Sequence, residues 1–255
     1  MSAALSAKAF TVRLRFDSDL SFFLPGENRG VAIVKTLHEK TSVKDVIESC
    51  GVPHPEVDLI CCDGVSVPFE HSLTRDAVVD VHGLNNSPAK PGEELQRRCV
   101  TKFVADGHLG KLARDLRLLG FDVVYDPDAS DTSLAASCAE DRALLTRDRR
   151  LLMHKIVQHG YCPRSHDPDD QIIEVVRRFD LAAHMTPYSR CVPCNGLLVK
   201  VNKADVFDQL EPLTKIHYQD FRRCMGCEKI YWSGSHFTKL ETRLAKIRQS
   251  LTEPS

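Results

Sequence analysis

The sequence predicts an α/β protein in which a parallel sheet carries helices on both faces. A small α+β domain is expected before this sheet and a zinc ribbon after it. Three observations support this fold class. The first 83 residues contain apolar strands around one helical segment, the chain from residue 99 alternates between strands and helices, and two CxxC pairs lie near the end. A length of 255 residues is enough for about two domains.

Residues 8–83 are predicted to form a β-grasp domain. The segment FTVRLRF and the stretch from Phe22 to Leu24 are typical of a hairpin. TSVKDVIESCG then places apolar side chains at helical spacing and ends at Gly51, and VDLICCDG and AVVDVHG are later strands. Residues 84–98 include NNSPAKPGEE, which is dense in turn-forming residues, and are expected to be a linker.

The segment 99–186 is predicted to form the parallel sheet. Its strands are KFVAD, FDVVYD, ALLT and YCPRS, and its helices are GKLARDLRLL, DTSLAASCAED, DRRLLMHKIVQH and DDQIIEVVRRF. Gly120 and Gly160 are expected to end the first and the third of these helices. Strands that alternate with such short helical crossovers are typical of a parallel sheet covered on both faces.

Residues 187–250 are predicted to form the zinc ribbon with a C-terminal helix. One CxxC motif contains Cys191 and Cys194, and the other contains Cys224 and Cys227. This spacing predicts a structural Zn²⁺ site, because four thiolates close a tetrahedron and leave no open position for catalysis.

Cations lie next to aromatic residues around the second CxxC motif, in FRRCMGCEKIYWSGSHF. This combination can grip and stack single-stranded nucleic acid. The same side chains could equally be packing residues of the ribbon. The candidates for nucleic-acid binding are Arg222, Arg223, Lys229 and Trp232.

Acidic residues follow three consecutive strands of the predicted sheet. Asp106 follows KFVA, three acids (Asp126, Asp128 and Asp131) follow FDVVY, and Asp148 follows ALLTR. Ligands of an open parallel sheet bind beyond the carboxyl ends of its strands, so these acids are expected to share one pocket. Carboxylates at close range need a cation, and their oxygens suit Mg²⁺ or Mn²⁺. The predicted chemistry is phosphodiester hydrolysis, although each acid could instead cap the helix that follows it.

Basic side chains accompany these acids in the sequence. Lys111 and Arg147 lie nearest to them and are the candidates for contacting a phosphate, and Arg114 and Arg149 could grip a nucleic-acid backbone. For Arg117 and Arg150 the preferred interpretation is an ordinary solvated face. The net charge of the chain is −1, but residues 221–248 hold seven Lys or Arg against two acids. A near-neutral protein with such a basic stretch can still bind nucleic acid.

Several separated blocks over residues 101–250 resemble, in order, the Mut-seven-C RNase family, a PIN-like ribonuclease domain with a zinc ribbon. The blocks are FVADGHLGKLARDLRLLGFDVVYDPDASD, ALLTRDRRLL, DDQIIEVVRRFDL, CNGLL and KIYWSGSH. The N-terminal block with GVPHPEVDLICCDG is similar to the ubiquitin-like β-grasp domain that often precedes this RNase domain in bacterial proteins.

The resemblance implies a PIN-like fold and metal-dependent cleavage of RNA. On the matching positions, Asp106, Asp131 and Asp148 become the ligands of a catalytic Mg²⁺ or Mn²⁺, with Asp128 as a further candidate. Ser130 stands where the family often has a second acid, which leaves the order of importance among the neighbouring acids open.

The expected function is that of a metal-dependent ribonuclease with RNA as its partner. The alternative is a non-catalytic RNA-binding adaptor, in which the acids cap helices while the ribbon and the basic C-terminal region bind RNA. A phosphatase with an aspartyl nucleophile is disfavoured because DGHLG offers one acid after the first strand.

Sulfur carriage by the β-grasp domain is disfavoured because it lacks a free C-terminal Gly-Gly, and the expected role is to dock a protein partner or to gate the substrate. The sequence shows neither an apolar run of about 20 residues nor a secretory signal, which predicts a cytoplasmic protein without a membrane partner.

Overall fold

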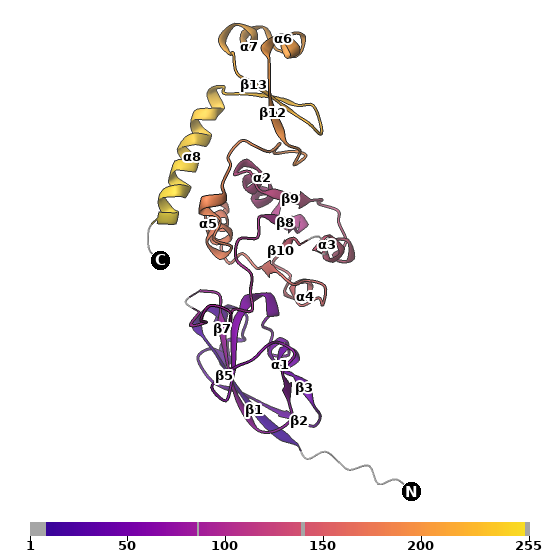
Figure 1. Cartoon of the computed structure of the whole chain (residues 1–255), viewed down its shortest axis with the longest axis vertical. Helices are drawn as coiled ribbons and strands as arrows, with labels where there is room; N and C mark the ends of the chain where they lie inside the picture. Colours follow the sequence, from indigo (N-terminus) through magenta and orange to yellow (C-terminus); the bar gives the residue numbers. More distant parts are fainter. Residues whose placement is uncertain (1–8, 86, 139–140, 253–255) are drawn as a thin grey trace. The chain divides into compact units, whose positions relative to one another are not determined.

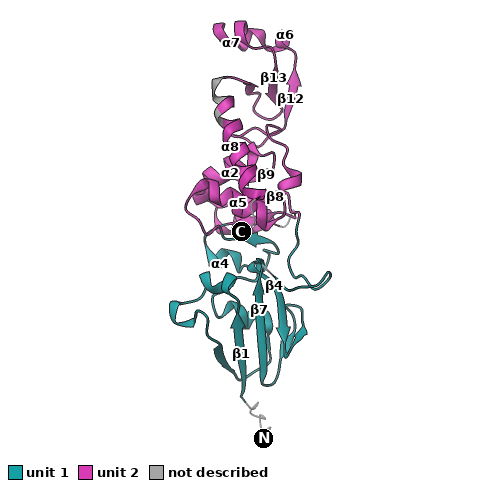
Figure 2. Cartoon of the chain, turned by 90° about the vertical axis from the view of Figure 1, so that its left-hand side faces the viewer, with its two compact units in different colours: residues 1–98, 146–162 teal, residues 99–145, 163–255 magenta. Residues whose placement is uncertain are grey.

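The structure, a computed structural model, describes residues 9–85, 87–138 and 141–252. The chain forms two compact units (Figures 1 and 2). The first unit spans Met1–Arg98 and Thr146–Cys162, and the second spans Cys99–Leu145 and Pro163–Ser255. The chain therefore leaves the second unit, adds 17 residues (146–162) to the first, and returns.

The first unit has the β-grasp arrangement expected from the sequence. Its main sheet has the strand order β2-β1-β7-β4-β5, in which β1 and β7 are parallel and the other neighbours are antiparallel. Helix α1 (Val43–Glu48) begins at Ser42, whose hydroxyl accepts the Asp45 N–H at 3.1 Å. The strands of this unit are β1 Phe10–Phe16, β2 Ile33–Leu37, β3 Thr41–Ser42, β4 Val57–Cys62, β5 Val65–Ser66, β6 Ser72–Leu73 and β7 Ala77–Gly83.

The predicted hairpin partner of the first strand is wrong. β1 pairs with β2, whereas the stretch from Phe22 to Leu24 is the end of the 3₁₀ helix η1 (Ser18–Phe22) and the turn after it. The Asp17 carboxylate caps the start of this helix by accepting the Leu20 N–H at 3.3 Å. The consecutive apolar side chains of this stretch fill the core from a turn and do not alternate across a strand, and Phe23 is 1% exposed. The other short 3₁₀ turns of this unit are η2 (Gly26–Asn28) and η3 (His54–Glu56).

The second unit contains the predicted parallel sheet. Strands β10 (Ala143–Leu145), β8 (Lys102–Ala105) and β9 (Asp122–Tyr125) lie in that order, and β8 is parallel to both neighbours. The helices around this sheet are η4 Gly107–Leu109, α2 Gly110–Leu118, α3 Asp131–Ser137 and α5 Pro168–Arg178. Phe103 of β8 lies at the centre of the core, with its ring centroid 5.3 Å from that of Phe179 and 6.2 Å from that of Phe121.

The segment 146–162 differs from its prediction. The expected long helix DRRLLMHKIVQH is only α4 (Arg149–Leu152), and β11 (Gly160–Tyr161) follows. Tertiary hydrogen bonds of the first unit occupy the polar groups here: His54 Nε2 lies 2.6 Å from the Val157 carbonyl, and the Glu56 carboxylate accepts the Cys162 N–H at 2.7 Å. Through these contacts residues 146–162 belong to the first unit, although the sequence predicted them within the 99–186 segment.

The linker 84–98 has neither helix nor strand in its described residues, and its second half packs on the first unit. The Leu95 N–H donates to the Asp58 carbonyl at 2.7 Å, and the Gln96 amide donates to the His54 carbonyl at 3.0 Å.

The C-terminal part of the second unit is a three-stranded antiparallel ribbon in the order β12-β13-β14. A helical segment (residues 203–217, with α6, η7 and α7) is inserted between β12 and β13. A small core lies between the ribbon and this inserted helical segment, and it consists of Val206, Leu210 and Phe221. The elements of this part are η6 Ala182–His184, β12 Leu198–Val201, α6 Lys203–Val206, η7 Phe207–Gln209, α7 Pro212–His217, β13 Phe221–Cys224, β14 Ile230–Trp232 and α8 Ser235–Thr252.

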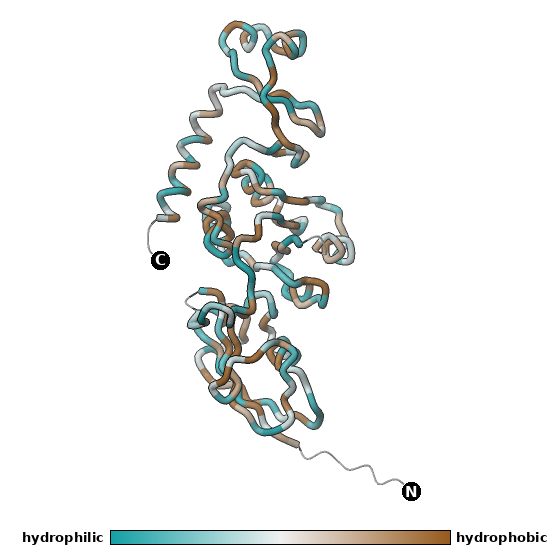
Figure 3. Tube along the Cα trace, viewed as in Figure 1, coloured by the Kyte–Doolittle hydropathy of each residue, from teal (hydrophilic) through white to brown (hydrophobic). Residues whose placement is uncertain are grey.

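Hydrophobic residues occur in short runs along the chain (Figure 3). Within the described residues, no helix has the length and apolar character needed to span a bilayer.

Candidate functional site

The four cysteines of the two CxxC motifs come together in the ribbon. Their sulfur atoms all lie within 4.8 Å of one another, with Cys191 Sγ 3.6 Å from Cys227 Sγ and Cys194 Sγ 3.3 Å from Cys224 Sγ. A tetrahedral Zn²⁺ with Zn–S bonds of about 2.3 Å places its sulfurs about 3.8 Å apart. The cluster therefore fits a structural Zn²⁺, as the spacing predicted.

Two features of the local backbone support this cysteine cluster. A Cβ atom on Gly196 would lie 2.7 Å from Cys224 Sγ, so this position needs a glycine. The N–H groups of Gly226 and Cys227 point at Cys224 Sγ, at 3.3 and 3.4 Å. Such N–H donors stabilise a metal-bound thiolate. In the absence of a cation, burial raises the pKa of the Cys191 thiol to about 12.

Arg117 connects the first CxxC motif (Cys191–Cys194) to the parallel sheet. It is 4% exposed, and its guanidinium donates to the Val123 carbonyl at 3.0 and 2.8 Å. It also donates to the carbonyls of Val192 at 3.0 Å and Pro193 at 2.8 Å, inside the first CxxC motif. Burial lowers the pKa of this guanidinium. The expected solvated face is therefore wrong for Arg117, and its position four residues after the buried Ala113 was the signal for an inward side chain.

A second set of polar contacts joins the ribbon to the start of β9. Asp122 accepts hydrogen bonds from Arg142 and from the Asn195 amide, both at 2.8 Å, and Arg190 lies 3.5 Å away. Burial favours a higher pKa for the Asp122 carboxyl, but the bonds from Arg142 and Asn195 outweigh it and lower this pKa. The ribbon is thus held to the sheet by a hydrogen bond from Asn195 and an ion pair with Arg190.

Asp106 ends the central strand β8, as the sequence predicted. It is half-buried, and it precedes η4 without making a capping hydrogen bond through its side chain. A Cβ atom on Gly107 would lie 2.8 Å from the Pro127 carbonyl oxygen, and the Tyr125 hydroxyl donates to the Gly107 carbonyl at 3.0 Å. The loops after β8 and β9 therefore lie against each other at one edge of the sheet.

The acids after β9 are exposed. Ser130 caps α3 by accepting the Ser133 N–H at 3.3 Å, so Asp131, the first residue of that helix, is not the cap. Asp126 instead accepts the N–H of Asp128 at 3.0 Å and shapes the loop.

Asp148 lies in the first unit and does cap a helix. Its carboxylate accepts the N–H groups of Arg150 at 2.7 Å and Leu151 at 3.3 Å at the start of α4. For this acid the capping alternative describes the observed contacts.

The carboxylates do not gather as the cysteines do. Within the described part of the chain, the four cysteines are the one group of three or more His, Cys, Asp or Glu side chains whose ligand atoms lie together. The oxygen donors of Asp106, Asp128 and Asp131 have the chemistry that Mg²⁺ or Mn²⁺ prefers, but they do not form a three-ligand cluster.

The predicted basic residues near the acids divide into two kinds. Lys111 and Arg114 are exposed and three residues apart on α2, so they share one face of that helix. Arg147 is half-buried. Arg149 is held within the first unit, because its guanidinium donates to the carbonyls of Phe23 at 2.8 Å and Phe22 at 3.0 Å. These contacts fix the position of the Arg149 side chain, and its contact with a nucleic-acid backbone stays a prediction.

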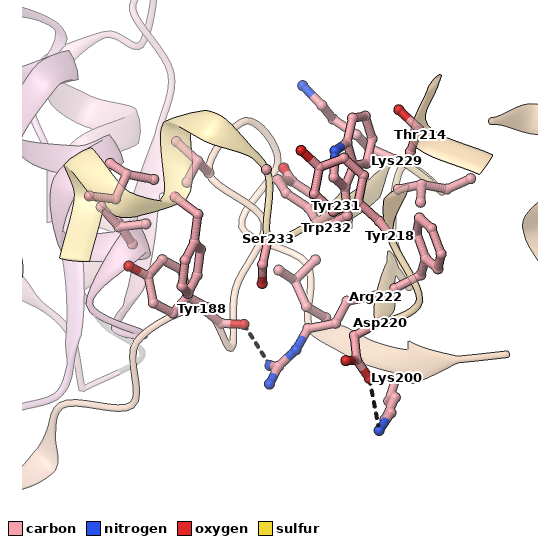
Figure 4. Close-up of a pocket in the computed structure, with 18 of the residues that line it drawn as sticks. Tyr188, Lys200, Thr214, Tyr218, Asp220, Arg222, Lys229, Tyr231, Trp232 and Ser233 are labelled. Carbon is pink, nitrogen blue, oxygen red and sulfur yellow. Dashed lines mark hydrogen bonds and ion pairs between the residues drawn. The ribbon is translucent and has the colours of Figure 1, made fainter. Parts of the chain in front are cut away.

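Three of the four predicted nucleic-acid contacts of the ribbon line one groove, shown in Figure 4. They are Arg222, Lys229 and Trp232. The fourth, Arg223, is half-buried beneath the inserted helical segment and lies 3.5 Å from the Asp205 carbonyl.

Two family models match the chain. The Mut7-C RNAse domain matches residues 101–244, which is more than half of the chain, and the Mut7-C ubiquitin domain matches residues 9–86. No curated protein and no solved structure matches it. The matched ranges cover the β-grasp sheet, the parallel sheet and the cysteine cluster described above. The chain therefore belongs to the Mut7-C RNAse family, with a Mut7-C ubiquitin-like domain before the RNase domain.

Proposed function

We propose that this protein is a ribonuclease that hydrolyses RNA phosphodiester bonds with the help of a divalent cation, and that Asp106 is its central acid. The observation that carries the proposal is the position of Asp106 in an RNase-family domain. It stands, half-buried, at the carboxyl end of the central strand β8. Ligands of parallel sheets bind at such strand ends.

The proposed acids come from neighbouring loops of the sheet. Asp106 and Asp131 follow β8 and β9, whose loops touch through Gly107 and Pro127. Asp148 and Asp128 are the further candidates. When bound, Mg²⁺ or Mn²⁺ would activate water and neutralise negative charge. Asp106 and Asp131 themselves contribute oxygen donors at one edge of the sheet.

Lys111 is the proposed phosphate contact on α2, the helix that follows the Asp106 loop, and Arg114 extends the same exposed face. A cation there would hold the RNA backbone electrostatically, without reading its sequence. Arg147 is proposed as a second phosphate contact from the 146–162 segment.

A non-catalytic RNA-binding adaptor is the second candidate function. Two observations favour it: Asp148 caps α4, and the carboxylates form no three-ligand cluster among the described residues. In that case the ribbon and the basic C-terminal region bind RNA. A protein partner for the β-grasp domain and a cytoplasmic location are proposed with either function.

The test is cleavage of labelled single-stranded and structured RNA by the full-length, zinc-loaded protein. Wild type and Asp106→Asn are compared in Mg²⁺, Mn²⁺ and EDTA, and the zinc content is measured after each incubation so that loss of the ribbon is not mistaken for loss of the catalytic ion. We expect cleavage in Mg²⁺ or Mn²⁺ that disappears in Asp106→Asn. Asp167→Asn is the control, because Asp167 is also an acid directly before a helix and lies outside the proposed site. RNA binding without cleavage under every condition would establish the adaptor instead.

A further inference from the structure

The ribbon and the start of α8 enclose a groove that no step of the proposed hydrolysis uses. Its volume is about 870 Å³, and its walls come from α7, the three ribbon strands and the first turns of α8 (Figure 4). Aromatic side chains make up much of the lining. They are Tyr188, Tyr218, Phe221, Tyr231, Trp232 and Phe237.

Trp232 offers a fixed and accessible aromatic face in this groove. It is 41% exposed, which is unusual for so large an apolar side chain. The Gly234 backbone lies close to one edge of the indole, because a Cβ atom added there would lie 3.1 Å from Nε1. The Tyr218 ring flanks it, with ring centroids 6.4 Å apart and an angle of 45° between the planes. The two tilted rings leave a platform on which a planar group can stack.

The charge of the groove is positive. Four of its lining residues are Lys or Arg, and Asp220 is the one acid in that lining. Lys200 is paired with Asp220 at 3.3 Å. Arg222, in contrast, donates to the neutral Tyr188 carbonyl at 2.8 Å, and the Lys229 ammonium lies 5.7 Å from the centre of the Tyr231 ring. Neither of these contacts cancels the positive charge, so both cations remain available to an anion.

We propose that this groove binds single-stranded RNA, with a base stacked on Trp232 and the backbone phosphates near Lys229 and Arg222. Aromatic faces beside cations match the two components of a nucleotide, its flat base and its phosphate. A duplex would not fit this role, because its bases are already stacked on each other. The proposal rests on the proposed function only for the class of substrate, since binding in the groove requires none of the acids.

The chain provides its own probe for this site, because Trp232 is the single tryptophan of the sequence. Unlabelled single-stranded oligoribonucleotide is titrated into the full-length, zinc-loaded protein without Mg²⁺ or Mn²⁺, and the tryptophan fluorescence is followed. We expect quenching that saturates with single-stranded RNA and is much weaker with a duplex of the same sequence. Unchanged fluorescence at RNA concentrations that bind the protein would overturn the proposal.

Variants locate the binding in the groove. Labelled RNA is used for these measurements. Trp232→Ala should weaken binding about 5- to 150-fold, which corresponds to the loss of one stacked base, whereas Trp232→Phe keeps a ring and should lose much less. Phe207→Ala is the control, because Phe207 is an exposed aromatic residue of η7, between the ribbon strands β12 and β13, and lies outside the groove. Wild-type affinity in Trp232→Ala with its zinc content intact would overturn the proposal.

The charge is tested separately. Lys229→Gln should reduce the salt dependence of binding by about one phosphate contact, and Lys40→Gln, an exposed lysine of the β-grasp unit, should leave it unchanged. Quenching without cleavage in any metal would support the groove and overturn the nuclease. Cleavage without quenching would do the reverse.

Discussion

Asp148 allows the two explanations of an acid at a strand end to be separated by one pair of substitutions. Its carboxylate accepts two N–H groups of α4, at 2.7 and 3.3 Å, and the proposed function also gives it a metal. Asparagine caps a helix about as well as aspartate but carries no charge. Alanine neither caps the helix nor carries a charge. Asp148→Asn therefore removes only the charge, and Asp148→Ala removes both the charge and the cap.

The expected effects differ in size. Asp148→Ala should lower the free energy of unfolding by about 1 kcal/mol, the usual cost of losing an N-cap, and lower the melting temperature by about 2–4 °C. Asp148→Asn should change the melting temperature very little. If the carboxylate serves the reaction, both variants should lose cleavage, by roughly 10²–10³-fold if the loss is like that of other groups that stabilise developing charge.

The assay combines thermal unfolding with single-turnover RNA cleavage in Mn²⁺. Asp167 supplies the matched control, because its carboxylate accepts the N–H groups of Asp169 and Asp170 at the start of α5, at 2.8 and 3.2 Å. Asp167→Ala should lower stability as Asp148→Ala does and leave the cleavage rate unchanged. Full activity in Asp148→Asn would refute a catalytic role for this carboxylate and leave it as a helix cap.

Three further predictions concern the attachment and the metal of the ribbon. Arg117→Met should lower the free energy of unfolding by about 1–3 kcal/mol, because it leaves the buried Val123 carbonyl and two part-buried carbonyls of the first CxxC motif without this donor. Thermal unfolding with a zinc-release assay checks this. Because the pKa of Asp122 is lowered in the fold, its contacts, including that with Arg142, stabilise the fold at pH values above its ordinary pKa of 3.8 and are lost as the pH falls through the lower folded pKa. Asp122→Asn should therefore flatten the low-pH part of a plot of stability against pH, and an unchanged low-pH part would contradict the assignment. Gly196→Ala should weaken zinc retention because its Cβ would lie 2.7 Å from Cys224 Sγ, whereas wild-type retention against a chelator would show that the knuckle can adjust.

The sequence was informative where local chemistry decides the structure. Gly51 and Gly120 end their helices with φ values of +95° and +98°, which glycine adopts without strain. The CxxC pairs predicted the cysteine cluster because zinc ligands have a fixed spacing. Asp106 was placed at the end of its strand because apolar runs that end in a polar residue mark the edge of a buried sheet.

Features that depend on distant contacts were predicted less well. The long helix expected after Asp148 is one turn, because His54 and Glu56, almost a hundred residues earlier, bind the backbone that follows it. Arg117 was expected in solvent, but carbonyls some 75 residues further along the chain hold it inside. The helical spacing after Ala113 indicates only that Arg117 faces inward, and the partners in both contacts depend on which surfaces the completed fold brings together.

Because residues 146–162 belong to the first unit, the two units alternate along the chain, and no single cut separates them. A fragment that begins at residue 99 would carry Glu56's partner Cys162 without Glu56, and Arg149 without the Phe22 and Phe23 carbonyls that it binds. A cut at residue 98 would therefore expose polar groups that are satisfied in the full chain. The ubiquitin-like domain is thus completed by the segment that contains Asp148.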